Sequence, residues 1–183
     1  TLEAGLRSGL DVRRWLRQGF LDSVAIGGGY YEFGSPFSEM STVAHDFGVP
    51  AYACLSTSNS QYAHDQNKMR GAAFRAWISG VDGLYLFNYM YPPERPGGPP
   101  SDDWFKLLDD IGDPKRLAVQ SRTYALDRSM LATEPEVAVY YAHAVWQGQV
   151  PLSVGMSSDE IGQTVVFDIP EDLKRNHPAA VAL

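Results

Sequence analysis

Cysteine, long apolar runs and clustered positive charge are all scarce in this 183-residue chain. The single cysteine, Cys54, excludes an internal disulfide framework. No apolar run approaches the ~20 residues that a membrane-crossing helix requires, so we expect no membrane span. The 15 Lys and Arg are outnumbered by 22 Asp and Glu, which gives a formal net charge of -7, and no basic cluster stands out that could follow a phosphate backbone. Nucleic acid is therefore not an expected partner.

The hydrophobic content is high enough to build a folded core. Apolar residues make up 44% of the chain and aromatic residues 12%, which suits one large or two small domains. The sequence does not begin with Met, carries no charged and apolar leader, and enters a helical pattern almost at once. We therefore expect an internal fragment whose targeting information lies outside it.

The stretch of residues 69–88 predicts the fold class. Apolar side chains recur at helical spacing from Met69 to Trp77, and Gly80 supplies a helix stop. The apolar run 84–87 then shows no alternation, as expected of a strand buried on both faces. A helix, a short turn and a buried strand in this order are typical of a parallel α/β sheet.

The same pattern extends along the chain. Helices are expected at residues 12–18, 36–46, 69–79 and 102–110, and strands at residues 20–26, 49–55 and 84–87. This gives about three strands and four helices in the order α-β-α-β-α-β-α. From about residue 118 the segments are β-rich and no helix separates them, which predicts an antiparallel domain. We therefore expect an α/β domain at residues 1–125 and the incomplete start of a β-sandwich-like domain at residues 126–183.

Three groups of residues carry a family resemblance. They run from Gly9 to Asp22, from Ala72 to Asn88 and from Leu107 to Ala118, and the phrase GVDGLYLFN that ends at Asn88 is the most specific part. Over residues 5–125 the chain resembles the final part of glycoside-hydrolase-like (β/α)8-barrel proteins of the family 10 glycosylhydrolase type. The resemblance implies that the chain holds the last three strands of a TIM barrel, followed by a β-sandwich.

The resemblance carries further expectations about partners and location. It implies a carbohydrate substrate, a hydrolase activity and a secreted or extracytoplasmic bacterial location. It also implies that the N-terminal part of the same barrel is missing and acts as a partner. Physical reasoning agrees, because three strands cut from a barrel have two open edges and an uncovered inner face.

The loops that follow the three expected strands are the candidate site. In a barrel these loops form one face, and here they span residues 27–34, 56–67 and 88–101. Their aromatic rings suit sugar C–H surfaces, and their polar groups suit sugar hydroxyls. The substrate-binding candidates are Tyr30, Tyr31, Tyr62, His64, Asp65, Asn88 and Tyr89. The alternative is that the loop aromatics only close the rim of the barrel.

Glu32 is the candidate catalytic residue. It lies in the first strand-end loop between aromatic residues that could desolvate it and raise its pKa, as a general acid requires. A solvated loop glutamate or a hydroxyl-binding group is the alternative. Glycoside hydrolysis normally needs a second carboxylate, yet the expected seventh strand ends in residues 54–57 without one. We therefore expect the second carboxylate upstream of residue 1, unless the mechanism differs or the protein binds sugar without cleaving it.

Other constellations point to simpler roles. The four histidines lack metal-ligand spacing, and Cys54 on a buried strand is expected to be inert, so neither a metal nor a cofactor is expected. Asp82 precedes its strand and should face the opposite edge from the site. Two competing functions remain open: a non-catalytic carbohydrate-binding or scaffold protein, and a barrel that binds a phosphate at the turn of residues 27–29.

Overall fold

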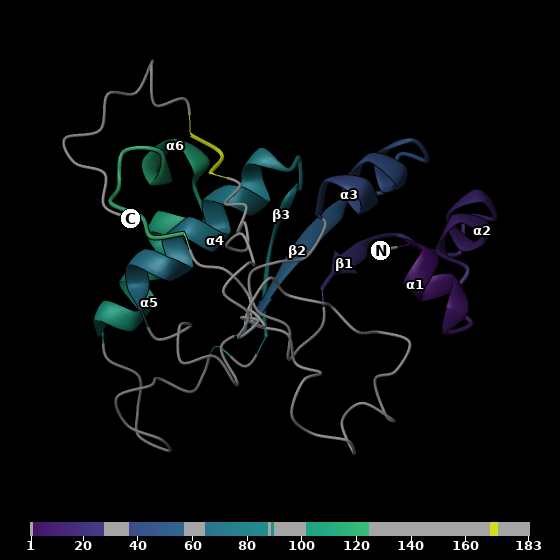
Figure 1. The fold of residues 1–183 in the computed structure, drawn as a ribbon, viewed down its shortest axis with the longest axis horizontal. Coiled ribbons are helices and arrows are strands. Elements are labelled where there is room, and N and C mark those ends of the chain that lie inside the picture. Colours follow the sequence, from purple (N-terminus) through teal and green to yellow (C-terminus); the bar gives the residue numbers. More distant parts are fainter. Residues whose placement is uncertain are drawn as a thin grey trace, which may run out of the picture.

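The computed structural model describes residues 2–27, 37–56, 65–87, 89, 102–124 and 169–171. Figure 1 shows the elements within these ranges. In chain order they are α1 (Leu2–Arg7), α2 (Val12–Arg17), β1 (Val24–Ile26), α3 (Phe37–His45), β2 (Ala51–Ser56), α4 (Gln66–Ile78), β3 (Gly83–Phe87), α5 (Asp102–Ile111) and α6 (Pro114–Leu117).

The three strands form one parallel sheet in the order β1-β2-β3. Val24 pairs with Ala51 in the first ladder, and Tyr52 pairs with Gly83 in the second. Helix α3 connects β1 to β2 and α4 connects β2 to β3, so each connection is a helical crossover between neighbouring strands. The expected parallel α/β arrangement is therefore confirmed for this part of the chain.

Helices cover one face of the sheet. The strand residues on that face are apolar and almost fully buried, for example Ile26, Ala53 and Leu55, with exposed fractions of 5%, 0% and 2%. They share one hydrophobic cluster with Phe37 of α3 and Met69 of α4. Figure 1 shows α3 and α4 packed along the sheet. This layer of helix on sheet is the core of the described structure.

The other face of the sheet carries a different set of side chains. Tyr52 and Tyr85 are 36% and 51% exposed, and Ala25, the register partner of Tyr52, is also exposed. The prediction that residues 84–87 are buried on both faces of the sheet is therefore wrong within the described part of the chain, because Tyr85 faces away from the helices. The apolar run was a poor guide here, since Leu84 and Leu86 contact the helical layer while Tyr85 does not.

A glycine lies just past the C-terminal end of four helices, which is the usual position of a helix-stop glycine. Gly9, Gly19, Gly48 and Gly80 all have positive φ, between 68° and 83°. After α2, the Gly19 N–H donates to Leu16 O and the Phe20 N–H donates to Trp15 O, which is the Schellman pattern. Asp11 caps the start of the same helix by accepting a hydrogen bond from the Arg14 N–H at 3.1 Å. The predicted bounds of α2 are thus confirmed by its caps.

Element bounds differ from expectation where local caps override the apolar pattern. Strand β1 begins at Val24 rather than residue 20, because Phe20 belongs to the helix stop of α2. Helix α6 and the bounds of α1 were not predicted, since four and six residues are too short to show a helical period. Helix α6 depends on its cap, where the Asp113 carboxylate accepts from the Lys115 N–H at 2.8 Å.

The chain beyond α6 packs on the first turns of α4. The Thr123 N–H donates to Asn67 O at 2.9 Å, and a Cβ added at Gly71 would lie 2.2 Å from Thr123 O. The Arg122 guanidinium then pairs with Glu171. Residues 125–168 and 172–183 lie outside the described residues, so the expected β-sandwich-like domain stays a prediction. Glu171, however, contacts the α/β domain directly.

Candidate functional site

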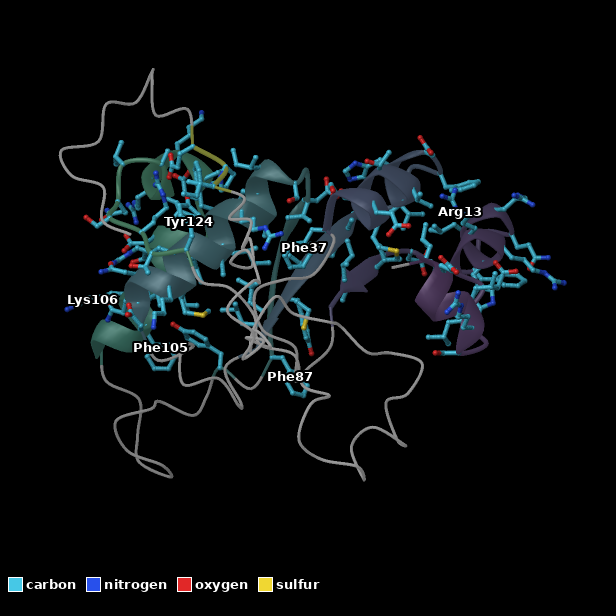
Figure 2. All side chains as sticks on the ribbon, viewed as in Figure 1. Arg13, Phe37, Phe87, Phe105, Lys106 and Tyr124 are labelled. Atoms are coloured by element: carbon cyan, nitrogen blue, oxygen red, sulfur yellow. The ribbon has the colours of Figure 1, made fainter. Side chains whose placement is uncertain are left out.

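The carboxyl ends of the three parallel strands define the candidate site. Strand β2 ends at Ser56 and β3 ends at Phe87, and these two residues are register partners. Strand β1 ends at Ile26, next to Gly27 with a φ of 127°. Figure 2 labels Phe87 at the lower end of the sheet. The chain segments that follow β1, β2 and β3 therefore all start at one edge, as the sequence predicted.

Most of the predicted site residues lie outside the described residues. These are Tyr30, Tyr31, Glu32, Tyr62, His64 and Asn88. Their roles in catalysis and substrate binding stay predictions. Asp65 and Tyr89 are described, and each has a defined environment at or near the same edge.

Asp65 caps helix α4. Its Oδ1 accepts hydrogen bonds from the Asn67 N–H at 2.8 Å and from the Lys68 N–H at 3.3 Å. The local sequence favours this, since aspartate is a preferred N-cap residue and its charge complements the helix dipole. Helix α4 returns antiparallel to the strands, so its N-terminus lies at the candidate edge. Asp65 thus lies at the candidate edge, where it fixes the start of α4.

Tyr89 is buried two residues after β3. Its exposed fraction is 8%, and burial raises the pKa of its phenol to about 12. Because a buried phenolate lacks solvation, the group stays a neutral hydroxyl at neutral pH. It can then donate a hydrogen bond, but its ring does not present an open flat face to solvent.

The strand ends themselves carry no acidic group. Within residues 24–27, 51–56 and 83–87 there is neither Asp nor Glu. Cys54 is 7% exposed and burial raises the pKa of its thiol, which agrees with the expected inert cysteine. The described strand ends therefore contribute no carboxylate to the candidate site.

Asp82 lies at the opposite edge, as predicted. Its Oδ2 accepts a hydrogen bond from the Ala51 N–H at 2.7 Å and lies 2.7 Å from His45 Nε2. The Ala51 N–H and then His45 lower the pKa of the Asp82 carboxyl. The pair links the end of α3 to the starts of β2 and β3, so both side chains have a structural role.

Two features of the described residues bear on metals and membranes. No three His, Cys, Asp or Glu side chains among the described residues come together in a way that could hold a metal ion. No helix within the described ranges is long and apolar enough to cross a membrane.

The sequence reading missed the exposed aromatic side chains on the face of the sheet opposite the helices. Tyr52 and Tyr85 come from neighbouring strands, and a Cβ added at Gly83 would lie 2.8 Å from Tyr52 Cδ1. The Tyr52 ring therefore lies across Gly83. The signal was present as alternation, because Ala51-Tyr52-Ala53 places one large ring between two small residues of the other face.

Comparison with known proteins adds no family. A scan against protein-family models found no match, and neither did a search of curated proteins. The resemblance of residues 5–125 to glycoside-hydrolase-like barrels therefore stays a prediction from the sequence.

Proposed function

We propose that this chain is the C-terminal part of a (β/α)8-barrel glycoside hydrolase, acting on an oligosaccharide or polysaccharide. The observation that carries the proposal is the common edge at the ends of β1, β2 and β3. The segments that start there contain the aromatic and amide residues suited to sugar, together with Glu32.

Sheet topology supports the barrel part of the proposal. The strands follow one another in spatial order, and the crossover helices α3 and α4 pack on the same face. A barrel repeats this unit eight times. Half of a doubly wound sheet also begins this way and also binds its ligands at the carboxyl ends of its strands, so the choice of a barrel rests on the sequence resemblance.

The unpaired strand edges and the exposed tyrosines of the second sheet face support a partner from the same barrel. Among the described residues, no strand pairs with the outer edges of β1 and β3, and Tyr85 stands 51% exposed on the open face. Open strand edges and exposed aromatic side chains on a sheet face are costly in water. The missing N-terminal strands would pair with both edges and close the barrel over this face.

Glu32 acts as the general acid in the proposed reaction. Its protonated carboxyl donates a proton to the glycosidic oxygen as the bond to the anomeric carbon breaks. A second carboxylate acts either as the base that accepts a proton from the attacking water or as the nucleophile whose glycosyl ester water then hydrolyses. The second carboxylate belongs to the upstream strands, because the described ends of β1, β2 and β3 have none.

The absence of a carboxylate from the described strand ends also favours a second candidate function. A barrel with Ser56 rather than a carboxylate at the end of β2 could bind carbohydrate without cleaving it. In that case Glu32 accepts hydrogen bonds from sugar hydroxyls and remains ionised. The two candidates share the binding face and differ only in turnover.

Binding and turnover measured on the same saccharides separate the candidates. The protein, extended by the proposed upstream strands, is titrated calorimetrically with a panel of neutral oligosaccharides and with inorganic phosphate, and reducing ends are then assayed. The hydrolase proposal predicts sugar binding together with release of reducing ends. Sugar binding without release would support the non-catalytic candidate, and binding of phosphate alone would contradict both.

A further inference from the structure

Helix α2 presents three arginines to solvent on one short segment. Arg13, Arg14 and Arg17 are all exposed, while Leu16 on the same helix is 4% exposed and joins the core. Arg13 and Arg17 are four residues apart, so they neighbour each other on the helix surface. Like charges at this spacing repel each other. These arginines were not singled out in the sequence analysis.

The three arginines have no ion-pair partner among the described residues. Other described arginines do have one: Arg70 lies 2.8 Å from Asp110, and Arg122 pairs with Glu171. The nearby Asp11 carboxylate accepts from a backbone N–H of α2 instead of a guanidinium. In a chain of net charge -7, a group of three unpaired cations is a local exception. It creates a positive patch that an anionic partner would match.

Two exposed apolar side chains flank the arginine helix. Leu10 precedes the N-cap and is 49% exposed, and Phe20 follows the C-terminal glycine and is 68% exposed. Both occupy the position after a positive-φ glycine, where an apolar side chain normally packs back on its helix. Val49 does this after α3 and is only 9% exposed. Leu10 before α2 and Phe20 after it therefore both project into solvent.

The arginines and the two apolar side chains are close together in the sequence. Leu10 and Phe20 flank α2, and the three arginines lie between them. Figure 2 places Arg13 at the end of the molecule formed by α1 and α2, away from Lys106 on α5. The surface formed by Leu10, Arg13, Arg14, Arg17 and Phe20 is named the α2 surface below.

We propose that the α2 surface docks the protein on an anionic phospholipid surface. The guanidinium groups pair with lipid phosphates, and the Phe20 and Leu10 side chains enter the headgroup region. A nucleic acid would match the arginines but would leave both apolar side chains in water. A lipid surface matches both kinds of group. Docking is peripheral, and it is independent of the proposed hydrolase activity.

Vesicle co-sedimentation of the full chain tests this proposal. The wild type is expected to bind vesicles of phosphatidylcholine mixed with phosphatidylglycerol, in a salt-sensitive manner, and not vesicles of phosphatidylcholine alone. Replacing Arg13, Arg14 and Arg17 together by Gln should weaken binding on the order of 100-fold. Replacing all three by Lys should retain most of the binding, and Phe20→Ser should weaken it about tenfold.

A matched control separates docking from net charge. Lys106, Lys115 and Arg116 are exposed cations on α5 and α6, and their triple replacement by Gln changes the net charge equally. This control should bind vesicles like the wild type. Equal loss in the control, or no binding of the wild type to the anionic vesicles, would overturn the proposal. Binding to duplex DNA but not to vesicles would also overturn it and would identify a nucleic acid partner.

Discussion

The buried Arg122–Glu171 pair gives the sharpest prediction about stability. Each side chain is 10% exposed, and Arg122 Nε donates to Glu171 Oε1 at 2.8 Å. Tyr124 Oη donates to the same oxygen at 2.6 Å, and burial, followed by this hydrogen bond, raises the pKa of the Tyr124 phenol. The guanidinium also donates to Leu117 O and lies 4.1 Å from the Phe74 ring centroid. One carboxylate thus holds residues 169–171 to residues 122–124, and Arg122 in turn contacts Phe74 of helix α4.

Removing Glu171 should therefore be strongly destabilising. Glu171→Ala leaves a buried guanidinium without its counter-charge, a change that typically costs about 3 to 5 kcal/mol. For a chain of this length the cost corresponds to a fall in Tm of about 6 to 20 °C. Urea unfolding followed by circular dichroism gives the free energy of unfolding, and the slope m shows whether the transition stays two-state.

The exposed Arg7–Glu3 pair provides a matched control. Its side chains are 69% and 74% exposed at an N–O distance of 2.5 Å, so Glu3→Ala should cost less than about 0.5 kcal/mol. Replacing both buried partners, as Arg122→Met with Glu171→Leu, should cost less than Glu171→Ala alone. If Glu171→Ala proves as mild as Glu3→Ala, the buried pair does not hold the two segments together.

Two further substitutions test the sheet. Gly83→Ala places a Cβ 2.8 Å from the Tyr52 ring and should cost about 1 to 3 kcal/mol in urea unfolding, a cost that Tyr52→Ser in the same chain should remove. Asp82 has a lowered pKa in the folded chain, so its stabilising effect is present above the unfolded-state pKa of about 3.9 and is lost as the pH falls through the folded pKa. When the pH is lowered from neutral to 3, the Tm of Asp82→Asn should therefore fall less than the Tm of the wild type. An equal fall in both proteins would contradict this role of Asp82.

Local patterns in the sequence were sufficient for the α/β order. Helix α4 was predicted from its apolar period and its stop at Gly80, whereas its start at Gln66 and the Asp65 cap were not predicted. The parallel pairing followed because each strand is preceded by a helix. Short elements such as α6 could not be predicted from periodicity, since their stability comes from one cap and from packing.

Burial of the second sheet face and long-range pairs could not be predicted in the same way. The apolar run 84–87 does not show what lies over Tyr85, because that depends on chain outside the strand. Arg122 and Glu171 are 49 residues apart, and no local pattern connects them. The candidate site was predicted by position alone: the common edge is confirmed, while the residues expected to do chemistry lie mainly outside the described ranges.

The most direct test of the proposed hydrolase is the turnover of one saccharide by two variants of the extended protein. Glu32→Gln removes the proposed general acid, and Asp46→Asn removes an exposed carboxylate after α3, at the opposite end of the sheet. The proposal predicts that kcat falls about 100- to 10,000-fold in Glu32→Gln, with sugar binding retained, and is unchanged in Asp46→Asn. Equal kcat in Glu32→Gln and the wild type would contradict it.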